Sequence, residues 1–198
     1  MIIGLTGPYC AGKNHVSAIL ESKGIPVIDV DKLGYQVLET EKERIFAQFG
    51  QDLKTQDGSL DRRLLGRRVF GQPEKLADLE AIVHPSANRL TDDWIASQKG
   101  HCAVNAALLH RSSAFNRMEK IILVSAPFLT RVCRGKHRDG LSYRQIFKRI
   151  ASQKDFYTQY LSINAEIYRV ENHSNGSLSS RRLERRIDAF VKGINQDG

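Results

Sequence analysis

The chain is poor in cysteine, in long apolar stretches and in aromatic residues, and each shortage excludes a class of protein. Three scattered cysteines, Cys10, Cys102 and Cys133, form neither a disulfide framework nor a metal-ligand spacing among 198 residues. The longest apolar runs have the length of strands, so we expect no membrane span and no membrane partner. Aromatic residues make up 8% of the chain and show no stacking pattern, so we expect no nucleic-acid partner. The N-terminus shows no signal-peptide features, and with the unpaired cysteines this predicts a cytoplasmic location.

The positive charge, by contrast, is abundant and concentrated in one half of the chain. The formal net charge is +8. Residues 1–99 carry 13 basic and 14 acidic side chains, whereas residues 100–198 carry 17 basic and 8 acidic ones. Such an asymmetry indicates a local anionic partner rather than general solubility.

Strand-like and helix-like patterns alternate along the sequence. Apolar runs predict strands near residues 2–6, 25–30, 101–109, 120–125 and 168–172, with helical spacing between them. A helix is expected over residues 62–70, and the next one is expected to stop near His84-Pro85. A helical stretch over residues 127–161 should break at Asp139-Gly140, and an amphipathic helix should end the chain. This alternation predicts an α/β fold with a parallel sheet, and the length fits one domain.

A glycine-rich loop (residues 7–13) follows the first predicted strand and opens the first helix. It reads Gly-Pro-Tyr-Cys-Ala-Gly-Lys, which is the pattern G-x4-G-K. Glycines let backbone N–H groups surround a phosphate, and the lysine reaches the outer phosphates of a nucleotide. We therefore predict ATP binding by residues of this loop and the two that follow: Gly7, Cys10, Ala11, Gly12, Lys13, Asn14 and His15. The alternative is a glycine-rich turn with an exposed lysine.

Asn14 and His15 stand where such loops normally carry Ser or Thr, whose hydroxyl ligates Mg²⁺. An amide oxygen is an acceptable ligand for Mg²⁺. We predict Mg²⁺ as the cofactor of ATP, held weakly by Asn14, directly or through water. His15 is a phosphate contact, a metal ligand or a residue of the helix surface.

Two carboxylates, Asp29 and Asp31, end the second predicted strand. Residues two apart in a strand share a face, so both carboxylates are expected at the carboxyl edge of the sheet. One of them would accept a proton from an attacking hydroxyl. The alternative is that Asp31 caps the helix beginning near Lys32.

Several blocks together give this chain a specific resemblance. They include IGLTG before the loop, GIPVIDVDKLG at residues 24–34 and DGSLDRRLLGRRVF at residues 57–70. The pairs His84-Pro85 and Arg138-Asp139 and the block RIASQ at residues 149–153 follow. The chain resembles the dephospho-coenzyme A kinases over most of its length.

The resemblance implies a nucleotide-kinase-like three-layer P-loop fold and a defined reaction. The family transfers a phosphoryl group from ATP to the ribose 3′-hydroxyl of dephospho-coenzyme A, the last step of coenzyme A synthesis. By position, Asp31 matches the catalytic base, Lys13 the loop lysine and Arg138 a lid arginine near the ATP phosphates. Arg62 and His84 match positions around the acceptor. The implied organisation is one domain over residues 1–198, with a helical acceptor region at about 58–100 and an Arg-rich lid at about 127–160.

The chain also departs from the family's pattern. The family loop usually reads GGIxSGKST, whereas this one reads GPYCAGKNH. The family's P-L-L-x-E stretch is replaced by ALLHR at residues 107–111, and ADxVIDN by AEIYRVEN at residues 165–172. A second interpretation is therefore a divergent P-loop protein that binds nucleotide but transfers phosphate weakly or not at all. The sequence does not fix the oligomeric state.

Overall fold

The computed structural model describes residues 1–160, 164–173 and 177–196. These residues divide into two compact units. The first comprises Met1–Ile28 and Ser97–Gly198, and the second comprises Asp29–Ala96. The helical acceptor region predicted for residues 58–100 lies mostly in the second unit, and the lid predicted for residues 127–160 lies in the first.

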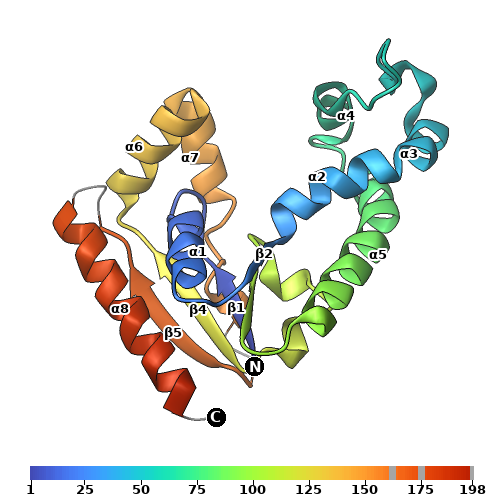
Figure 1. Ribbon diagram of the computed structural model, residues 1–198. Helices are drawn as coiled ribbons and strands as arrows, with labels where there is room; N and C mark the ends of the chain where they lie inside the picture. Colours follow the sequence, from blue (N-terminus) through green and yellow to red (C-terminus); the bar gives the residue numbers. More distant parts are fainter. Residues whose placement is uncertain (161–163, 174–176, 197–198) are drawn as a thin grey trace. The chain divides into compact units, whose positions relative to one another are not determined.

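A parallel sheet of five strands forms the centre of the first unit (Figure 1). Its strands run in the order β2 (Val27–Asp29), β3 (Cys102–Asn105), β1 (Ile2–Thr6), β4 (Lys120–Ser125) and β5 (Glu166–Glu171). β1 occupies the middle position and pairs in parallel with β3 and β4, with Gly4 opposite Val104 and Ile121. The glycine-rich loop therefore leaves the sheet at the centre of its carboxyl edge, which is where open α/β folds bind ligands. The predicted α/β class is confirmed.

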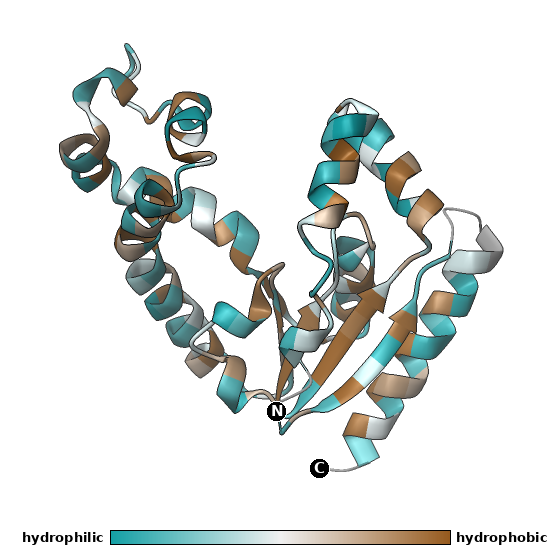
Figure 2. Cartoon of the chain, turned by 180° about the vertical axis from the view of Figure 1, so that it is seen from behind, coloured by the Kyte–Doolittle hydropathy of each residue, from teal (hydrophilic) through white to brown (hydrophobic). Residues whose placement is uncertain are grey.

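Two helices cover one face of this sheet, α1 (Lys13–Ser22) and α8 (Ser177–Gln196). Their apolar side chains, Val16 and Leu20 on α1 and Ile187 and Phe190 on α8, form one buried cluster with Leu5 and other strand residues. Figure 2 shows β4 as an apolar strand, while β5 at the edge of the sheet and α8 carry both polar and apolar residues. This packing fixes the first turn of α1 against the end of β1.

A helical pair follows β4. α6 (Phe128–Asp139) ends at Gly140, which has a positive φ of 64°. α7 (Tyr143–Ala151) begins with a capping box in which Ser142 and Gln145 satisfy each other's backbone N–H groups. The predicted break at Asp139-Gly140 is thus confirmed.

The second unit is helical. It contains α2 (Val30–Thr40), α3 (Lys42–Phe49), α4 (Arg62–Val69) and most of α5 (Pro73–Ser97). Phe46, Leu53 and Leu65 are buried in its own apolar cluster. Asp61 caps α4 by accepting hydrogen bonds from the N–H groups of Arg63 and Leu64.

Two expectations about local structure are wrong. α5 does not stop near His84-Pro85 but continues through Pro85 to Ser97. Buried residues on both sides of the proline, Ile82 before it and Ala87 and Thr91 after it, hold one face of the helix in place. The second strand is also shorter than expected, since β2 ends at Asp29 and α2 begins at Val30.

Among the helices of the described residues, none combines the length and the apolar character needed to cross a membrane.

Candidate functional site

The glycine-rich loop closes tightly between β1 and α1. Gly12 has a φ of 98° and forms the N-cap of α1, while Cys10 also adopts a positive φ, of 59°. This conformation is accessible to glycine but costs other residues about 1–2 kcal/mol. The N–H groups of His15 and Val16 both donate to Gly12 O, and Ala11 N donates to Pro8 O at 3.0 Å. Lys13 is therefore the first helical residue, beside the positive end of the α1 dipole.

The two glycines of the motif are required by close packing as well. A Cβ atom on Gly7 would lie 2.5 Å from the carbonyl oxygen of Val124 in β4. A Cβ atom on Gly12 would collide with the side chain of Asn172. Both glycines therefore bring the loop into contact with neighbouring strands and their ends.

Three side chains from later in the sequence hold the loop by its carbonyl groups. Arg131 Nε donates to Tyr9 O at 2.8 Å, and Arg134 Nη1 donates to Ala11 O at 3.2 Å. Asn172, just after β5, donates to Ala11 O at 3.1 Å and accepts from Arg134 Nη2 at 3.0 Å. These hydrogen bonds occupy the carbonyl groups of Tyr9 and Ala11 and so hold the backbone of the loop in its curved conformation, which a phosphate cradle needs.

Burial lowers the pKa of both loop-binding arginines, Arg131 and Arg134, from its ordinary value. Burial also raises the pKa of the Cys10 thiol, which is 8% exposed. The loop is thus lined by two partly desolvated cations and a neutral thiol. These surroundings favour an anion, because a bound phosphate would stabilise the two guanidinium charges that are partly shielded from water.

Arg138, the predicted lid arginine, lies at the last turn of α6. Its guanidinium donates to Asp139 at 2.7 Å and lies 5.3 Å from the centre of the Tyr9 ring. The Tyr9 hydroxyl also donates to Asp139. Hydrogen bonding to Arg138 holds the pKa of Asp139 down at about 2, so this carboxylate stays ionised.

Asn14 and His15 make separate contacts from the first turn of α1. Asn105 Nδ2, at the end of β3, donates to Asn14 Oδ1 at 3.3 Å. Asn105 Oδ1 is buried and has no hydrogen-bond partner among the residues that the structure describes. These two amide oxygens are of the type that Mg²⁺ accepts. His15 is exposed and lies 3.2 Å from Ser180 Oγ on α8.

The residues predicted around the acceptor, Asp31, Arg62 and His84, all lie in the second unit. Asp31 is in the first turn of α2, and Asp29 is the cap, because its Oδ1 accepts from Lys32 N at 3.1 Å. The expectation that the two carboxylates share one face of a strand is therefore wrong. The alternative that Asp31 caps this helix is also wrong, because Asp29 is the cap. Because β2 ends at Asp29, only Asp29 belongs to the strand.

Arg62 of α4 contacts the same side of α2 on which Asp31 lies. The Arg62 guanidinium lies 5.5 Å from the centre of the Tyr35 ring. Tyr35 follows Asp31 by four residues, so the two lie on the same side of the helix. His84 is half-buried in α5. The second unit thus presents a carboxylate and a guanidinium on neighbouring elements.

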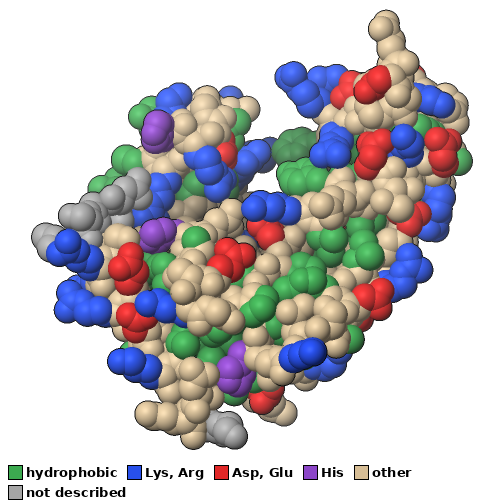
Figure 3. Space-filling model, viewed as in Figure 1, with side chains coloured by type: hydrophobic (Ala, Val, Ile, Leu, Met, Phe, Trp, Pro, Cys, Tyr) green, Lys and Arg blue, Asp and Glu red, His purple; other side chains and the backbone are tan. Residues whose placement is uncertain are grey.

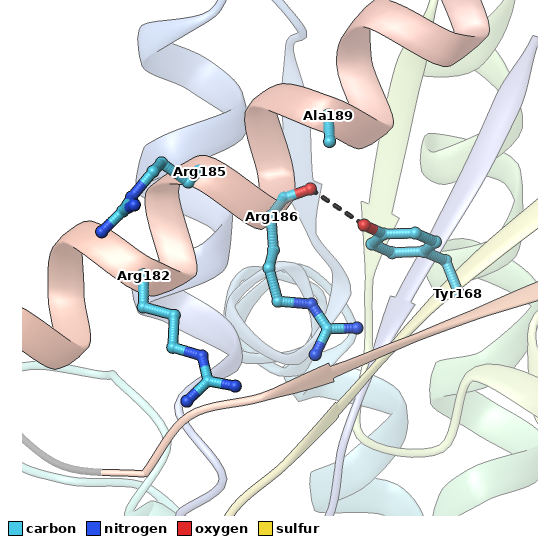
Figure 4. A pocket seen from close by; sticks show the side chains of 5 residues that line it. All are labelled: Tyr168, Arg182, Arg185, Arg186 and Ala189. Carbon is cyan, nitrogen blue, oxygen red and sulfur yellow. Dashed lines mark hydrogen bonds between the residues drawn. The ribbon is translucent and has the colours of Figure 1, made fainter.

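A separate group of arginines lies along α8. Arg182, Arg185 and Arg186 line an open pocket with Tyr168 and Ala189 (Figure 4). The Tyr168 hydroxyl donates to Arg186 O at 3.1 Å, and the Arg186 guanidinium lies 5.9 Å from the Tyr168 ring. Figure 3 shows blue side chains over this part of the first unit. These residues lie on α8 and β5 and were not assigned to a substrate.

Comparisons with known proteins agree with the loop geometry. The model of the family described as dephospho-CoA kinase matches residues 1–172. The chain belongs to the dephospho-CoA kinase family. A dephospho-CoA kinase of Shouchella clausii is 38% identical over 160 residues, covering 77% of this chain and 81% of the relative. One of Treponema denticola is 30% identical over 195 residues, covering 92% and 87%.

Solved structures support the same fold. A Thermus thermophilus protein is 33% identical, with a TM-score of 0.80, and the match covers 98% of this chain and 97% of that one. A shikimate kinase of Bacteroides thetaiotaomicron matches with a TM-score of 0.54 at 15% identity, over 97% and 98% of the two chains, which indicates the shared P-loop fold. As a member of its family, the chain is a kinase, a phosphotransferase of coenzyme A biosynthesis.

The sequence analysis missed several residues that shape the loop. Asn172 appeared only as the last letter of a blurred family motif, although it packs against Gly12. Tyr9 and Gln153 had no assigned role, yet Tyr9 N donates to Gln153 Oε1 at 2.6 Å. The one available signal for Tyr9 was that the family pattern has Ile at this position of the loop.

Proposed function

We propose that the chain transfers the γ-phosphoryl group of ATP to the ribose 3′-hydroxyl of dephospho-coenzyme A, producing coenzyme A and ADP. The observation that carries this proposal is the glycine-rich loop at the central strand of a chain that matches its family over residues 1–172. In this reaction the 3′-oxygen forms a bond to the γ-phosphorus while the bond from that phosphorus to the bridging oxygen of ADP breaks.

The first unit would bind ATP. The N–H groups of the loop and of the first turn of α1 would surround the phosphates, and Lys13 would neutralise charge on their outer oxygens. The predicted contacts of Gly7, Cys10, Ala11, Gly12, Asn14 and His15 follow from their places in and after the loop. Arg138 would stabilise the charge that develops on the phosphates during transfer.

Asn14 and Asn105 are the residues that would hold Mg²⁺, directly or through water. Their amide oxygens fit this ion, which binds few protein ligands and keeps several waters and phosphate oxygens. Bound Mg²⁺ would supply positive charge to the phosphates of ATP. Among the described residues there is no group of three or more His, Cys, Asp or Glu side chains suited to a metal. The proposed ligands of Mg²⁺ are therefore the amide oxygens of Asn14 and Asn105, phosphate oxygens of ATP and water.

The second unit would bind the acceptor. Asp31 would accept the proton of the attacking 3′-hydroxyl, and Arg62 and His84 would contact the phosphate-bearing part of dephospho-coenzyme A. We infer the cytoplasm as the location, since Cys10, Cys102 and Cys133 are all free thiols in the structure.

A steady-state assay with dephospho-coenzyme A and Mg·ATP tests this function. Asp31→Asn should lower kcat by about 10²–10⁴-fold, because it removes the proton acceptor while leaving the shape of the side chain. Asp29→Asn is the matched control. Asn caps helices about as well as Asp, so this variant should retain activity. ATP binding without turnover on dephospho-coenzyme A would contradict the proposal and favour a nucleotide-binding protein that does not transfer phosphate to this acceptor.

A further inference from the structure

Tyr9 is held on its backbone and on its side chain by the α6–α7 region. Its N–H donates to Gln153 just after α7, and its carbonyl oxygen accepts from Arg131 of α6. Its hydroxyl donates to Asp139 at the end of α6. Tyr9 occupies a variable position of the G-x4-G-K motif, yet its N–H group, its carbonyl group and its hydroxyl all bind residues of this region.

Two arginines lie against the Tyr9 ring. The guanidinium carbon of Arg138 is 5.3 Å from the ring centre and that of Arg149, on α7, is 5.5 Å from it. A guanidinium within about 6 Å of an aromatic face is attracted to the ring. Arg149 also lies 3.6 Å from the Asp139 carboxylate that Arg138 binds. The Tyr9 ring and the Asp139 carboxylate therefore hold the two guanidinium groups close together beside the loop.

The backbone of α6 has space for this ring. Gly135 is buried, and a Cβ atom placed on it would lie 3.0 Å from Cε1 and 3.0 Å from the hydroxyl oxygen of Tyr9. That separation is tighter than ordinary van der Waals contact, so a larger residue would push the ring away. A glycine inside a helix is unfavourable by itself, and here it leaves room for the tyrosine.

Burial and the hydrogen bond to Asp139 raise the pKa of Tyr9 to about 12. The hydroxyl is therefore protonated at neutral pH and acts as a donor to the carboxylate. Asp139 remains ionised under the same conditions. The cluster then combines two guanidinium charges with a single carboxylate, and the excess positive charge lies beside the loop that would receive the phosphates.

We propose that Tyr9 is a positioning residue that sets the orientation of Arg138 and Arg149 toward the phosphates of ATP. This inference rests on the proposed function, since it concerns how that function's nucleotide is held. The ring limits the positions of both guanidinium groups before ATP arrives, and the Tyr9–Asp139 hydrogen bond fixes the carboxylate that pairs with them. Less side-chain freedom is lost when the nucleotide binds, and this saving favours affinity.

The first test compares two substitutions of Tyr9. Tyr9→Leu removes both the ring and the hydroxyl, and we expect KM for ATP to rise about tenfold while KM for dephospho-coenzyme A changes less than about twofold. Tyr9→Phe retains the ring and loses only the hydrogen bond. It should restore most of the ATP affinity, leaving KM for ATP within about threefold of wild type.

The second test moves the ring without changing Tyr9. Gly135→Ala should raise KM for ATP several-fold, because the new Cβ displaces the Tyr9 ring. The melting temperature should change little, because the helix preference of Ala offsets part of the packing cost. Tyr168→Leu is the matched control. It removes another tyrosine–arginine contact of the first unit, on β5 and α8, and should lower the melting temperature without changing KM for ATP (Figure 4).

Two results would overturn the proposal. One is a KM for ATP in Tyr9→Leu within about twofold of wild type. The other is an equal rise of that KM in Tyr9→Leu and Tyr168→Leu, which would indicate general loosening of the unit. Calorimetric titration of each full-length variant with Mg·ATP measures the same affinity without an acceptor. If the wild type binds ATP but does not phosphorylate dephospho-coenzyme A, the proposed function fails while the test of Tyr9 remains decisive.

Discussion

The two compact units differ in charge, in architecture and in the substrate that we assign to each. The first carries 20 Lys and Arg against 9 Asp and Glu, a net charge of +11, and contains the sheet. The second is helical and carries 10 Lys and Arg against 13 Asp and Glu, a net charge of −3. The difference in net charge between the two units is thus larger than the difference between the two halves of the sequence.

Two arginines of each unit illustrate a difference in partners, although the first unit also contains ion pairs such as Arg138 with Asp139. In the second unit Arg68 pairs with Asp52 at 2.5 Å and Arg44 pairs with Glu41 at 3.1 Å, so these charges are neutralised locally. In the first unit Arg131 and Arg134 hydrogen-bond to neutral carbonyl groups of the glycine-rich loop. The hydrogen bond of Arg131 to the neutral Tyr9 carbonyl does not neutralise the charge of this guanidinium. The contrast supports the binding of the more highly charged phosphates of ATP by the first unit.

The largest expected effect on activity comes from Lys13, the residue of the first unit to which we assign the outer phosphates of ATP. Lys13→Ala should lower kcat/KM by about 10³-fold or more, because it removes the positive charge that would stabilise the transferred phosphoryl group. Lys23→Ala is the control, since Lys23 caps the other end of α1 and pairs with Asp188 at 2.7 Å. Equal losses in the two variants, measured by steady-state kinetics, would contradict a specific role of Lys13.

The loop and most of the sheet could be predicted because their signals are local. G-x4-G-K lies in seven consecutive residues, and the boundaries of β4 are those of an apolar run. The contacts that complete the loop could not be predicted in this way. Tyr9 meets Asp139 across 130 positions, and Asn172 meets Ala11 across 161. Such pairings depend on the order of the strands, which no short segment encodes.

The errors have the same cause. Pro85 is a reliable sign of a helix end when only its missing N–H is considered. Burial of Ile82 and Ala87 on either side of it decides otherwise. Similarly, β2 is an edge strand of three residues, and Asp29 ends it by capping α2 through Lys32 N. Pattern alone placed Asp31 in that strand, although it lies in the helix.

The next largest effect concerns stability and tests whether the units are independent. Phe46 is 1% exposed in the apolar cluster of the second unit, so Phe46→Ala should lower the free energy of unfolding by about 3–5 kcal/mol. Phe70→Ala changes the same atoms at a side chain that is 76% exposed, and it should cost about 0.5 kcal/mol or less.

Urea unfolding measures the loss of stability, and titration of the folded Phe46→Ala protein with each substrate tests whether the two units are independent. If they are, the variant should keep the wild-type affinity for Mg·ATP while its affinity for dephospho-coenzyme A falls. A parallel loss of affinity for both substrates would break the comparison, since it would show that the two units act as one cooperative structure.

A smaller effect is expected from the arginine assigned to the acceptor. Arg62→Ala should raise KM for dephospho-coenzyme A about tenfold and leave KM for ATP unchanged, because a charged hydrogen bond to a phosphate is lost in the second unit only. Arg63→Ala, at the exposed neighbouring position of α4, is the control. A rise in KM for ATP instead would mean that the units do not divide the substrates as proposed.

The smallest effect concerns the metal and the residue that departs from the family pattern. Asn14→Ser restores a hydroxyl at the start of α1 and removes the contact with Asn105 Nδ2 at 3.3 Å. Since Mg²⁺ requires near-octahedral geometry and a short hydroxyl reaches it more easily than an amide, the Mg²⁺ concentration for half-maximal activity should fall about threefold. The measurement is a Mg²⁺ titration at saturating ATP. An increased Mg²⁺ requirement would show instead that the Asn14–Asn105 pair is itself the better site, and that this loop has adapted to amide ligands.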